Sequence, residues 1–308
     1  MNGIVDEGDS VAEGADLSDV ADLSAAAIPS AGATGRGATV PPEAPVIRAP
    51  WSDRGDGGAI VTTRGGGVSV APYASLNLGD HVGDEPQAVA ANRATVQAWL
   101  GGRRIAWLAQ CHGDRVVDAL EAAAAAEAGD ALQADAVITD APGVVCAVMV
   151  ADCLPVLLRS GSGAVVGAAH AGWRGLCNGV LERTVEAMRD RAGGAGKADG
   201  DGEASGDDWQ AWLGPAIGPA AFEVGPEVRA AFLDNATPAE RAETDGAFVA
   251  GANGKYFGNL PTLARLRLAR VGVHRVDGGT LCTVRDAARF FSYRRDGQTG
   301  RIAALIWR

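Results

Sequence analysis

The chain has 308 residues, a formal net charge of −11 and a hydrophobic content of 47%, which suffices for one large or two small domains with a well-buried core. Such an acidic chain lacks the basic face that general nucleic-acid binding requires, although a few arginines and a metal ion can make one pocket positive for a small anion. Its five cysteines are odd in number and show no framework spacing, which argues against a disulfide scaffold and favours a reducing compartment.

The N-terminal segment and the apolar runs bear on targeting. The first ten residues, MNGIVDEGDS, have neither a basic region nor an apolar core, so we expect no signal peptide. No apolar run reaches the roughly 18 residues that a membrane span needs. Residues 1–48 are rich in Asp, Glu, Gly, Ala, Ser and Pro and contain no aromatic residue, so they cannot offset their ordering entropy. We predict a cytoplasmic protein with a disordered acidic tail over 1–48 and one folded domain over 49–308.

The first predicted elements lead to a glycine-rich loop. Residues 60–63 predict a strand, which runs into the loop 64–69 with its arginine and three consecutive glycines. Glycine there permits a positive φ and close approach of a ligand, but the loop lacks the Lys-Ser/Thr ending of a nucleotide P-loop, and an ordinary tight turn is the alternative. A helix follows to about Leu100, with Asp84 as its expected N-cap and Pro86 in its first turn.

The middle of the chain is a series of short apolar runs separated by turns. Such runs, bounded by Pro-Gly and Gly-Ser-Gly turns, predict buried strands, here over 134–140, 144–150, 154–160 and 164–170. Cys153 lies where the second run ends and His170 where the fourth ends, so neighbouring strands would bring them together. A thiolate and an imidazole held close together form either a metal site or a Cys/His nucleophile pair.

A third candidate ligand is His112, in a segment that predicts the end of a strand and a turn. It stands between Cys111 and Gly113 rather than on an apolar face. A lone histidine is more often structural than a ligand, so its candidacy depends on meeting Cys153 and His170 in space.

The remaining elements complete a mixed pattern. The Ala/Glu tract 121–131 predicts a solvated helix or loop, and the Gly/Asp-rich stretch 193–208 predicts a surface loop. Further helices are expected over 178–191, 226–233 and 260–271, and further strands over 209–213 and 302–307. Strands joined by short turns, without a regular βαβ rhythm, predict the α+β class.

Taken together, the motifs resemble one family. They occur in order and with plausible spacing over roughly 52–308: TTRGGGVS (62–69), PYASLNLGDHVGD (72–84), QCHGDRV (110–116), ADAVIT (134–139), ADCLPVLL (151–158), HAGWRG (170–175), WLGPAIGP (212–219), FEVG (222–225) and FFSYRRDGQTGRIAALIW (290–307). The set resembles the laccase-domain, or multicopper polyphenol oxidase, family, now understood as zinc-containing purine nucleoside phosphorylases with adenosine deaminase activity.

This resemblance implies a fold, a metal and substrates. The fold would be a single α+β domain with mixed sheets in α/β/β/α layers. The metal would be Zn²⁺, with copper the lesser candidate, held by His112, Cys153 and His170. The partners would be purine nucleosides and inorganic phosphate, with methylthioadenosine phosphorylase activity as well. Two positions depart from the family pattern: Cys111, where an aliphatic residue is usual and where we favour packing, and Asn259, where an acidic residue is usual.

Zinc chemistry explains why these residue types suit the reactions. Three nitrogen and sulfur ligands leave one position of a tetrahedral zinc ion open, where a bound water becomes acidic enough to attack adenosine. Phosphorolysis needs positive charge beside the phosphate and a hydrogen-bond donor beside the departing purine. Arg64 is the preferred phosphate ligand, because a guanidinium binds phosphate bidentately. Arg174 and Arg294 are weaker candidates, for which a structural ion pair is the alternative.

Three further polar residues in the motifs are candidates for a supporting role. We expect Asn77, His81 and Asp152 to bind substrate or to orient the ligands. Asp152 has an alternative as a capping or turn residue.

Three other functions remain open from the residues alone. A copper oxidase of phenols would use many histidines, commonly in His-X-His pairs, whereas this chain has four histidines and no such pair. A metal-free hydrolase would use Cys153 as nucleophile and His170 as base, with His112 or Asp152 orienting them. A small-ligand binding or cell-wall accessory protein is the non-enzymatic alternative.

Overall fold

Strand β6 (Val144–Val150) shows why the chain forms layers. All seven of its residues are buried, and successive side chains of a strand point to opposite faces. Val145, Ala147 and Met149 belong to one apolar cluster, whereas Val144 and Cys146 belong to another. A sheet with this central strand must therefore be covered on both faces.

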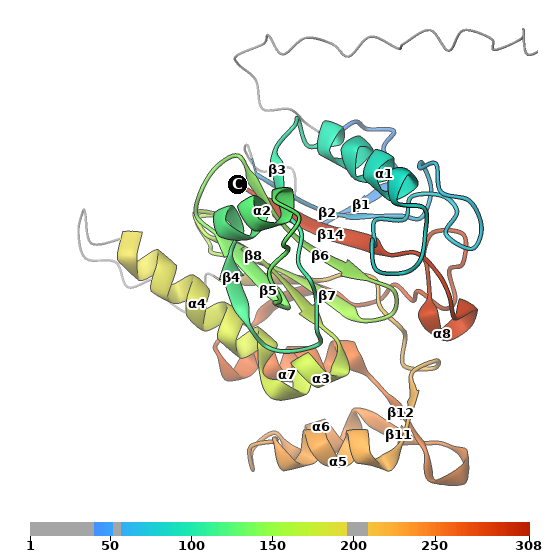
Figure 1. Ribbon diagram of the computed structural model, residues 1–308. Coiled ribbons are helices and arrows are strands. Elements are labelled where there is room, and N and C mark those ends of the chain that lie inside the picture. Colours follow the sequence, from blue (N-terminus) through green and yellow to red (C-terminus); the bar gives the residue numbers. More distant parts are fainter. Residues whose placement is uncertain (1–39, 52–56, 196–208) are drawn as a thin grey trace, which may run out of the picture. The chain divides into compact units, whose positions relative to one another are not determined.

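The computed structural model describes residues 40–51, 57–195 and 209–308. The first sheet has the strand order β1-β2-β14-β6-β3. Its other members are β1 (Val46–Arg48), β2 (Gly58–Thr62), β14 (Ile302–Trp307) and β3 (Arg104–Ala106). Neighbouring strands are antiparallel except for β3 and β6, which are parallel. Helix α1 (Pro86–Trp99) packs on its outer face through Val96, beside Val145 and Ile60 (Figure 1).

The second sheet lies against the inner face of the first. Its order is β13-β9-β7-β8-β5-β4. The strands are β4 (Val116–Asp118), β5 (Ala136–Thr139), β7 (Leu154–Arg159), β8 (Val166–Ala171), β9 (Gln210–Leu213) and β13 (Arg275–Gly278). Val137, Leu157 and Trp212 face the first sheet, in the cluster that also contains Val144. This cluster is the core between the two sheets.

Helices cover the outer face of the second sheet. They are α3 (Trp173–Asn178), α4 (Val180–Ala195) and α7 (Leu260–Arg270). Leu176, Val185 and Leu268 from these helices pack with Val156 and Leu158 of β7. Helix, sheet, sheet and helix thus follow in order (Figure 1), and the predicted α+β fold with α/β/β/α layers is confirmed.

Smaller elements complete the part of the chain that the structure describes. A third sheet has the order β10-β12-β11, with β10 (Glu223–Val224), β12 (Tyr256–Gly258) and β11 (Phe248–Ala250). The other helices are α2 (Ala119–Glu127), α5 (Pro226–Asp234), α6 (Arg241–Gly246), the 3₁₀ helix Ala252–Gly254 and α8 (Tyr293–Asp296). No helix within the described ranges is long and apolar enough to cross a membrane.

Regular structure is found slightly outside the predicted limits at two places. Strand β1 pairs with β2, so a strand lies just before the expected start of the domain at residue 49. Apolar Val46 and Ile47 can complete the sheet edge, which the composition of the tail concealed. Helix α4 reaches Ala195, so the predicted loop 193–208 starts too early. The rest of that loop, and the predicted tail up to residue 39, lie outside the described residues.

Several local expectations also need correction. The helix expected over 178–191 is α4, which begins at Val180; the short helix α3 before it was not expected, and Gly179, with a φ of 97°, separates the two. The N-cap of α1 is Glu85, since the carboxylate of Asp84 accepts hydrogen bonds from Ser69 and Asn77 instead. Helix α2 buries its alanines at 119, 122 and 123, so it packs on the core and is not simply solvated.

Candidate active site

The site begins where the chain crosses from one sheet to the other. Strand β6 ends at Val150 in the first sheet and β7 begins at Leu154 in the second, so Asp152 and Cys153 lie in the crossing. Asp152 is buried and has a φ of 94°. Its carboxylate accepts a hydrogen bond from the Thr283 hydroxyl at 2.5 Å and one from the backbone N–H of Arg294, in the first turn of α8, at 2.7 Å. Asp152 therefore both shapes the turn and binds an N–H group in the first turn of α8, whose N-cap is Ser292.

The pairing of β7 with β8 brings His170 beside Cys153. His170 is opposite Pro155 in the antiparallel register, two residues beyond Cys153. It is almost fully buried, with 3% of its surface exposed. Gly172 lies two residues after His170, and a Cβ there would lie 3.0 Å from Cys153 Sγ and 3.1 Å from His112 Cδ2. A Cβ at this position would therefore force both side chains to move by a few tenths of an ångström.

His112 completes the group from the loop between β3 and β4. Its φ of 62° is left-handed, and its Nε2 lies 3.8 Å from Cys153 Sγ. Its ring is 4.8 Å from that of His170, in an edge-to-face arrangement. The ligand atoms of His112, Cys153 and His170 all lie within 4.8 Å of one another. The structure thus brings together the three side chains that the sequence singled out.

Asp135 connects two members of this group. It is fully buried just before β5, and its Oδ1 accepts hydrogen bonds from His170 Nδ1 at 2.8 Å and from the backbone N–H of His112 at 2.9 Å. Sequence reasoning missed Asp135, because its only signal is a polar residue directly before an apolar strand. The thiol of Cys111, expected to pack, is instead exposed and hydrogen-bonds to Asp135 Oδ2 at 3.2 Å.

Asp135, Cys153 and His170 shift one another's pKa values. Burial opposes ionisation of Asp135, but hydrogen bonds from His170 and from the Gly113 backbone outweigh it and hold the pKa of the carboxyl below its ordinary range. Burial would raise the pKa of Cys153, yet the charge of His170 and a hydrogen bond from His112 lower it to about 6. Burial would lower the pKa of His170, but the Cys153 thiolate and Asp135 raise it to about 9. Without metal, Cys153 and His170 therefore form an ion pair.

The group opens into a cavity of about 500 Å³. Apolar and aromatic side chains form part of its wall, among them Trp173, Phe222, Leu260 and Tyr293. Basic side chains form another part: His81, Arg174, Arg294 and Arg301. A concave site with aromatic faces, several cations and a group of ligating atoms suits a small, partly aromatic and partly anionic molecule.

The predicted arginines lie in different settings. Arg174 lines the cavity, with its guanidinium 4.4 Å above the Trp173 ring, and within the described residues it has no hydrogen bond or ion pair. Arg294 also lines the cavity and donates to the carbonyl of Ala221. Arg64 does not line it, since its guanidinium donates to the carbonyls of Ala74 and Ala287. Arg301, which the sequence did not single out, lines the cavity beside the metal-ligating group.

The supporting residues are likewise divided. Asn77 is buried away from the cavity, where its oxygen accepts from the backbone of Gly79 and Arg301 and its amide nitrogen donates to Asp84. His81 is exposed at the cavity wall. Asn259, the other departure from the family pattern, caps α7 by accepting from the N–H of Thr262.

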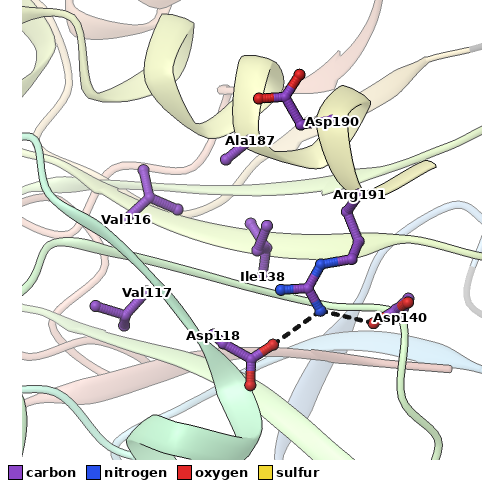
Figure 2. A pocket seen from close by; sticks show the side chains of 8 residues that line it. All are labelled: Val116, Val117, Asp118, Ile138, Asp140, Ala187, Asp190 and Arg191. Atoms are coloured by element: carbon purple, nitrogen blue, oxygen red, sulfur yellow. Dashed lines mark hydrogen bonds and ion pairs between the residues drawn. The ribbon is translucent and has the colours of Figure 1, made fainter. Parts of the chain in front are cut away.

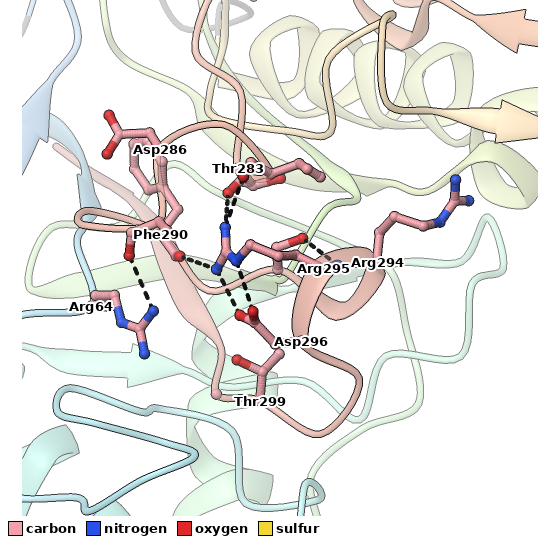
Figure 3. A network of polar contacts seen from close by, with 12 residues as sticks. Arg64, Thr283, Asp286, Phe290, Arg294, Arg295, Asp296 and Thr299 are labelled. Carbon is pink, nitrogen blue, oxygen red and sulfur yellow. Dashed lines mark hydrogen bonds and ion pairs between the residues drawn. The ribbon is translucent and has the colours of Figure 1, made fainter.

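A network around Arg295 braces the cavity wall. As Figure 3 shows, its guanidinium donates to the carbonyls of Thr283 and Phe290 and pairs with Asp296. These contacts hold the segment that presents the Thr283 hydroxyl and the Arg294 backbone to Asp152. The orientation of the crossing therefore depends on residues about 130 positions away in the sequence.

A second hollow, of about 580 Å³, lies between β4, β5 and α4 (Figure 2). Its one lining arginine, Arg191, pairs with Asp118 at 2.9 Å and Asp140 at 2.8 Å. Because that charge is already matched and the lining contains no histidine or cysteine, this hollow has none of the features of the first.

Known proteins resemble this chain along most of its length. The family described as multi-copper polyphenol oxidoreductase laccase matches residues 58–308. A relative from Pseudomonas aeruginosa named purine nucleoside phosphorylase is 49% identical over 250 residues, which are 81% of this chain and 92% of the relative. The Escherichia coli relative named purine nucleoside phosphorylase YfiH is 47% identical over 251 residues, covering 81% and 93%.

Solved structures agree with the fold. A protein from Neisseria meningitidis, 46% identical, superposes with a TM-score of 0.74 over 85% of this chain and 98% of its own. YlmD from Geobacillus stearothermophilus, 31% identical, superposes with a TM-score of 0.76 over 89% and 99%.

Proposed function

This chain belongs to the multi-copper polyphenol oxidoreductase laccase family, and we propose that it is a purine nucleoside phosphorylase, which converts a nucleoside and phosphate into free base and ribose 1-phosphate. The observation that carries the proposal is the cavity in which one His-Cys-His group faces aromatic and cationic side chains. Aromatic faces stack on a purine, and guanidinium groups bind phosphate. Relatives 49% and 47% identical that carry this name support the choice.

The donor set fits zinc. Two imidazoles and one thiolate are ligands that zinc prefers, and three protein ligands are typical of catalytic zinc sites. Within the described residues, His112, Cys153 and His170 form the one group of this kind, whereas multicopper oxidation needs several metal centres. We therefore propose that these three residues hold Zn²⁺. When bound, zinc would supply Lewis acidity and positive potential at this end of the cavity.

Phosphate binding and departure of the purine depend on other side chains of the cavity. Arg174 binds the incoming phosphate, because its guanidinium is exposed to the cavity and forms no other polar contact within the described ranges. Arg294 and Arg301 add positive charge on the same wall. The hydroxyl of Tyr293 or the imidazole of His81 donates a hydrogen bond to the departing purine. Phosphate thus attacks C1′ of the ribose as the bond to the base breaks.

Two further activities of the same cavity are part of the proposal. We propose that it takes adenosine for deamination and methylthioadenosine for phosphorolysis, since both present an adenine ring to the same aromatic walls. A cytoplasmic location, where free nucleosides and phosphate are abundant, stays a prediction from the sequence.

One experiment tests the function directly. Purified protein of measured metal content is incubated with a panel of purine nucleosides, with and without inorganic phosphate, while free base, ribose 1-phosphate and ammonia are followed. We expect base release that requires phosphate and scales with zinc content. Base release at the same rate without phosphate would overturn the assignment, and copper-dependent oxidation of phenols would replace it.

The thiolate–imidazolium pair favours one second candidate, a metal-free cysteine hydrolase. Cys153, with its pKa lowered to about 6, would be the nucleophile, and His170, oriented by Asp135, would transfer the proton. Zinc would block such an enzyme by binding the thiolate, whereas chelation of zinc would abolish the proposed phosphorylase. The response to chelator therefore separates the two.

A further inference from the structure

Asp135 is surrounded by hydrogen-bond donors from two separate parts of the chain. Its Oδ2 accepts from the backbone N–H of Gly113 at 2.7 Å and from that of Cys111 at 3.2 Å, and its Oδ1 accepts from the backbone N–H of His112. Oδ1 also lies 2.8 Å from His170 Nδ1, and the Asp135 carbonyl accepts the backbone N–H of His170 at 2.7 Å. One buried side chain thus contacts both histidines of the group.

The donors around the Asp135 carboxyl group favour its ionised form. Three consecutive backbone N–H groups, which can only donate, point at the two carboxylate oxygens. Such a cluster favours the ionised carboxylate, in which both oxygens accept and neither carries a proton. The hydrogen between Asp135 and His170 therefore sits on Nδ1, so Nε2 is the nitrogen of His170 that can bind a metal ion once its own proton has left.

We propose that Asp135 is the positioning residue of the metal centre, acting on two ligands at once. It holds His170 in the tautomer whose Nε2 can bind a metal ion, and it holds the left-handed turn that carries His112. Asp135 does not itself ligate, because both oxygens are already engaged. The inference rests on the metal centre of the proposed function and not on its substrate, so its test measures metal binding rather than turnover.

Asparagine at this position is the informative substitution. Asp135→Asn keeps the size of the side chain but replaces one oxygen by an NH₂ group. If that group faces His112 and His170, it opposes a backbone N–H and leaves Nδ1 of His170 as an acceptor, so Nε2 takes the proton. If it faces Gly113 and Cys111, it opposes two other N–H groups and disturbs the same turn.

Zinc affinity measured by competition with a chromophoric chelator tests the proposal. We expect Asp135→Asn to weaken zinc binding about 10–100-fold, as is usual when a carboxylate behind a metal-ligating histidine is lost. Asp118→Asn is the matched control, because Asp118 also accepts two backbone N–H groups and pairs with a cation, yet lies away from the cavity. The control should stay within about twofold of wild type. An Asp135→Asn affinity equally close to wild type would overturn the proposal.

A second measurement needs no variant and covers the case in which Asp135→Asn fails to fold. The chain has only four histidines, so nitrogen NMR can assign the ring of His170 in the zinc-loaded wild-type protein. The proposal requires a proton on Nδ1 and metal on Nε2, and the opposite pattern would refute it. Zinc binding without phosphorolysis would refute only the proposed function. A wild-type protein that binds no zinc would refute both the proposed function and the role of Asp135.

Discussion

Replacing Gly172 with alanine adds one methyl group between two of the proposed zinc ligands. Gly172 has φ −59° and ψ 156°, which alanine adopts without strain, so the backbone does not oppose the change. The new Cβ would lie 3.0 Å from Cys153 Sγ and 3.1 Å from His112 Cδ2, whereas ordinary contacts begin at 3.4 Å. The perturbation is therefore confined to the ligands.

The size of the effect follows from these distances. Both ligands must move by about 0.3–0.4 Å, which exceeds the ±0.2 Å within which metal–ligand distances normally fall. Overpacking of this kind costs about 1–3 kcal/mol. If the strain falls on the metal centre, it corresponds to a zinc affinity about 10–100-fold weaker, at about 1.4 kcal/mol for each factor of ten. We expect that outcome because His112 lies in an exposed loop that can give way.

Zinc affinity and urea unfolding of the metal-free protein together test this prediction. Gly225→Ala is the matched control, because Gly225 is also a helix N-cap in extended backbone, while the atoms nearest to its new Cβ belong to the flexible carboxylate of Glu227. Both variants should lose at most about 1 kcal/mol of folding stability from the cap, but only Gly172→Ala should lose zinc affinity. Zinc binding by Gly172→Ala that equals the control would refute the proposed ligand set.

Four other outcomes follow from the site. Cys153→Ala should abolish zinc binding and phosphorolysis while circular dichroism stays native; metal retained at one equivalent would contradict this. Arg174→Ala should raise the apparent KM for phosphate about 10-fold, the value of roughly one charged hydrogen bond, at unchanged stability. Arg64→Ala should instead lower the free energy of unfolding by about 1–3 kcal/mol and leave the KM for phosphate unchanged, since the Arg64 guanidinium donates to backbone carbonyls. Steady-state kinetics and urea unfolding measure both quantities, and a raised KM at unchanged stability would contradict the prediction. In metal-free protein, the rate of alkylation of Cys153 should rise through about pH 6, because only the thiolate reacts. Alkylation of Cys111 should need a higher pH, because hydrogen bonding to Asp135 raises the pKa of its thiol. Peptide mass spectrometry would show the opposite order if the charge assignment were wrong.

Strands that are buried on both faces could be read from the sequence. The runs 144–150 and 302–307 became β6 and β14 with the predicted ends, because a strand covered on both sides must be apolar throughout. Strands of three residues, such as β4 and β11, give no periodic signal and were missed. The break between α3 and α4 depends on the backbone of Gly179, which composition alone does not reveal.

The site could be predicted only in part, for a physical reason. His112, Cys153 and His170 have side chains whose chemistry is rare enough to be noticed wherever they occur. Asp135 has an ordinary side chain, and its importance comes from donors more than 20 residues away. Arg64 shows the converse: its glycine-rich loop suggested an anion site, but its guanidinium is used to fasten backbone carbonyls.

Two carboxylates hold the strained parts of the site in place. Among the described residues, only His112, Asp152 and Asn253 combine a side chain with a positive φ, and two of these three lie at the cavity. Such conformations cost about 1–3 kcal/mol each and persist only where neighbouring contacts enforce them. Here the enforcing contacts are those of Asp135 with the His112 backbone and those of the Asp152 side chain with Thr283 and Arg294. Because the strain is held before any ligand arrives, the three ligating side chains are already grouped, and a metal ion that binds them need not supply the energy to assemble its own site.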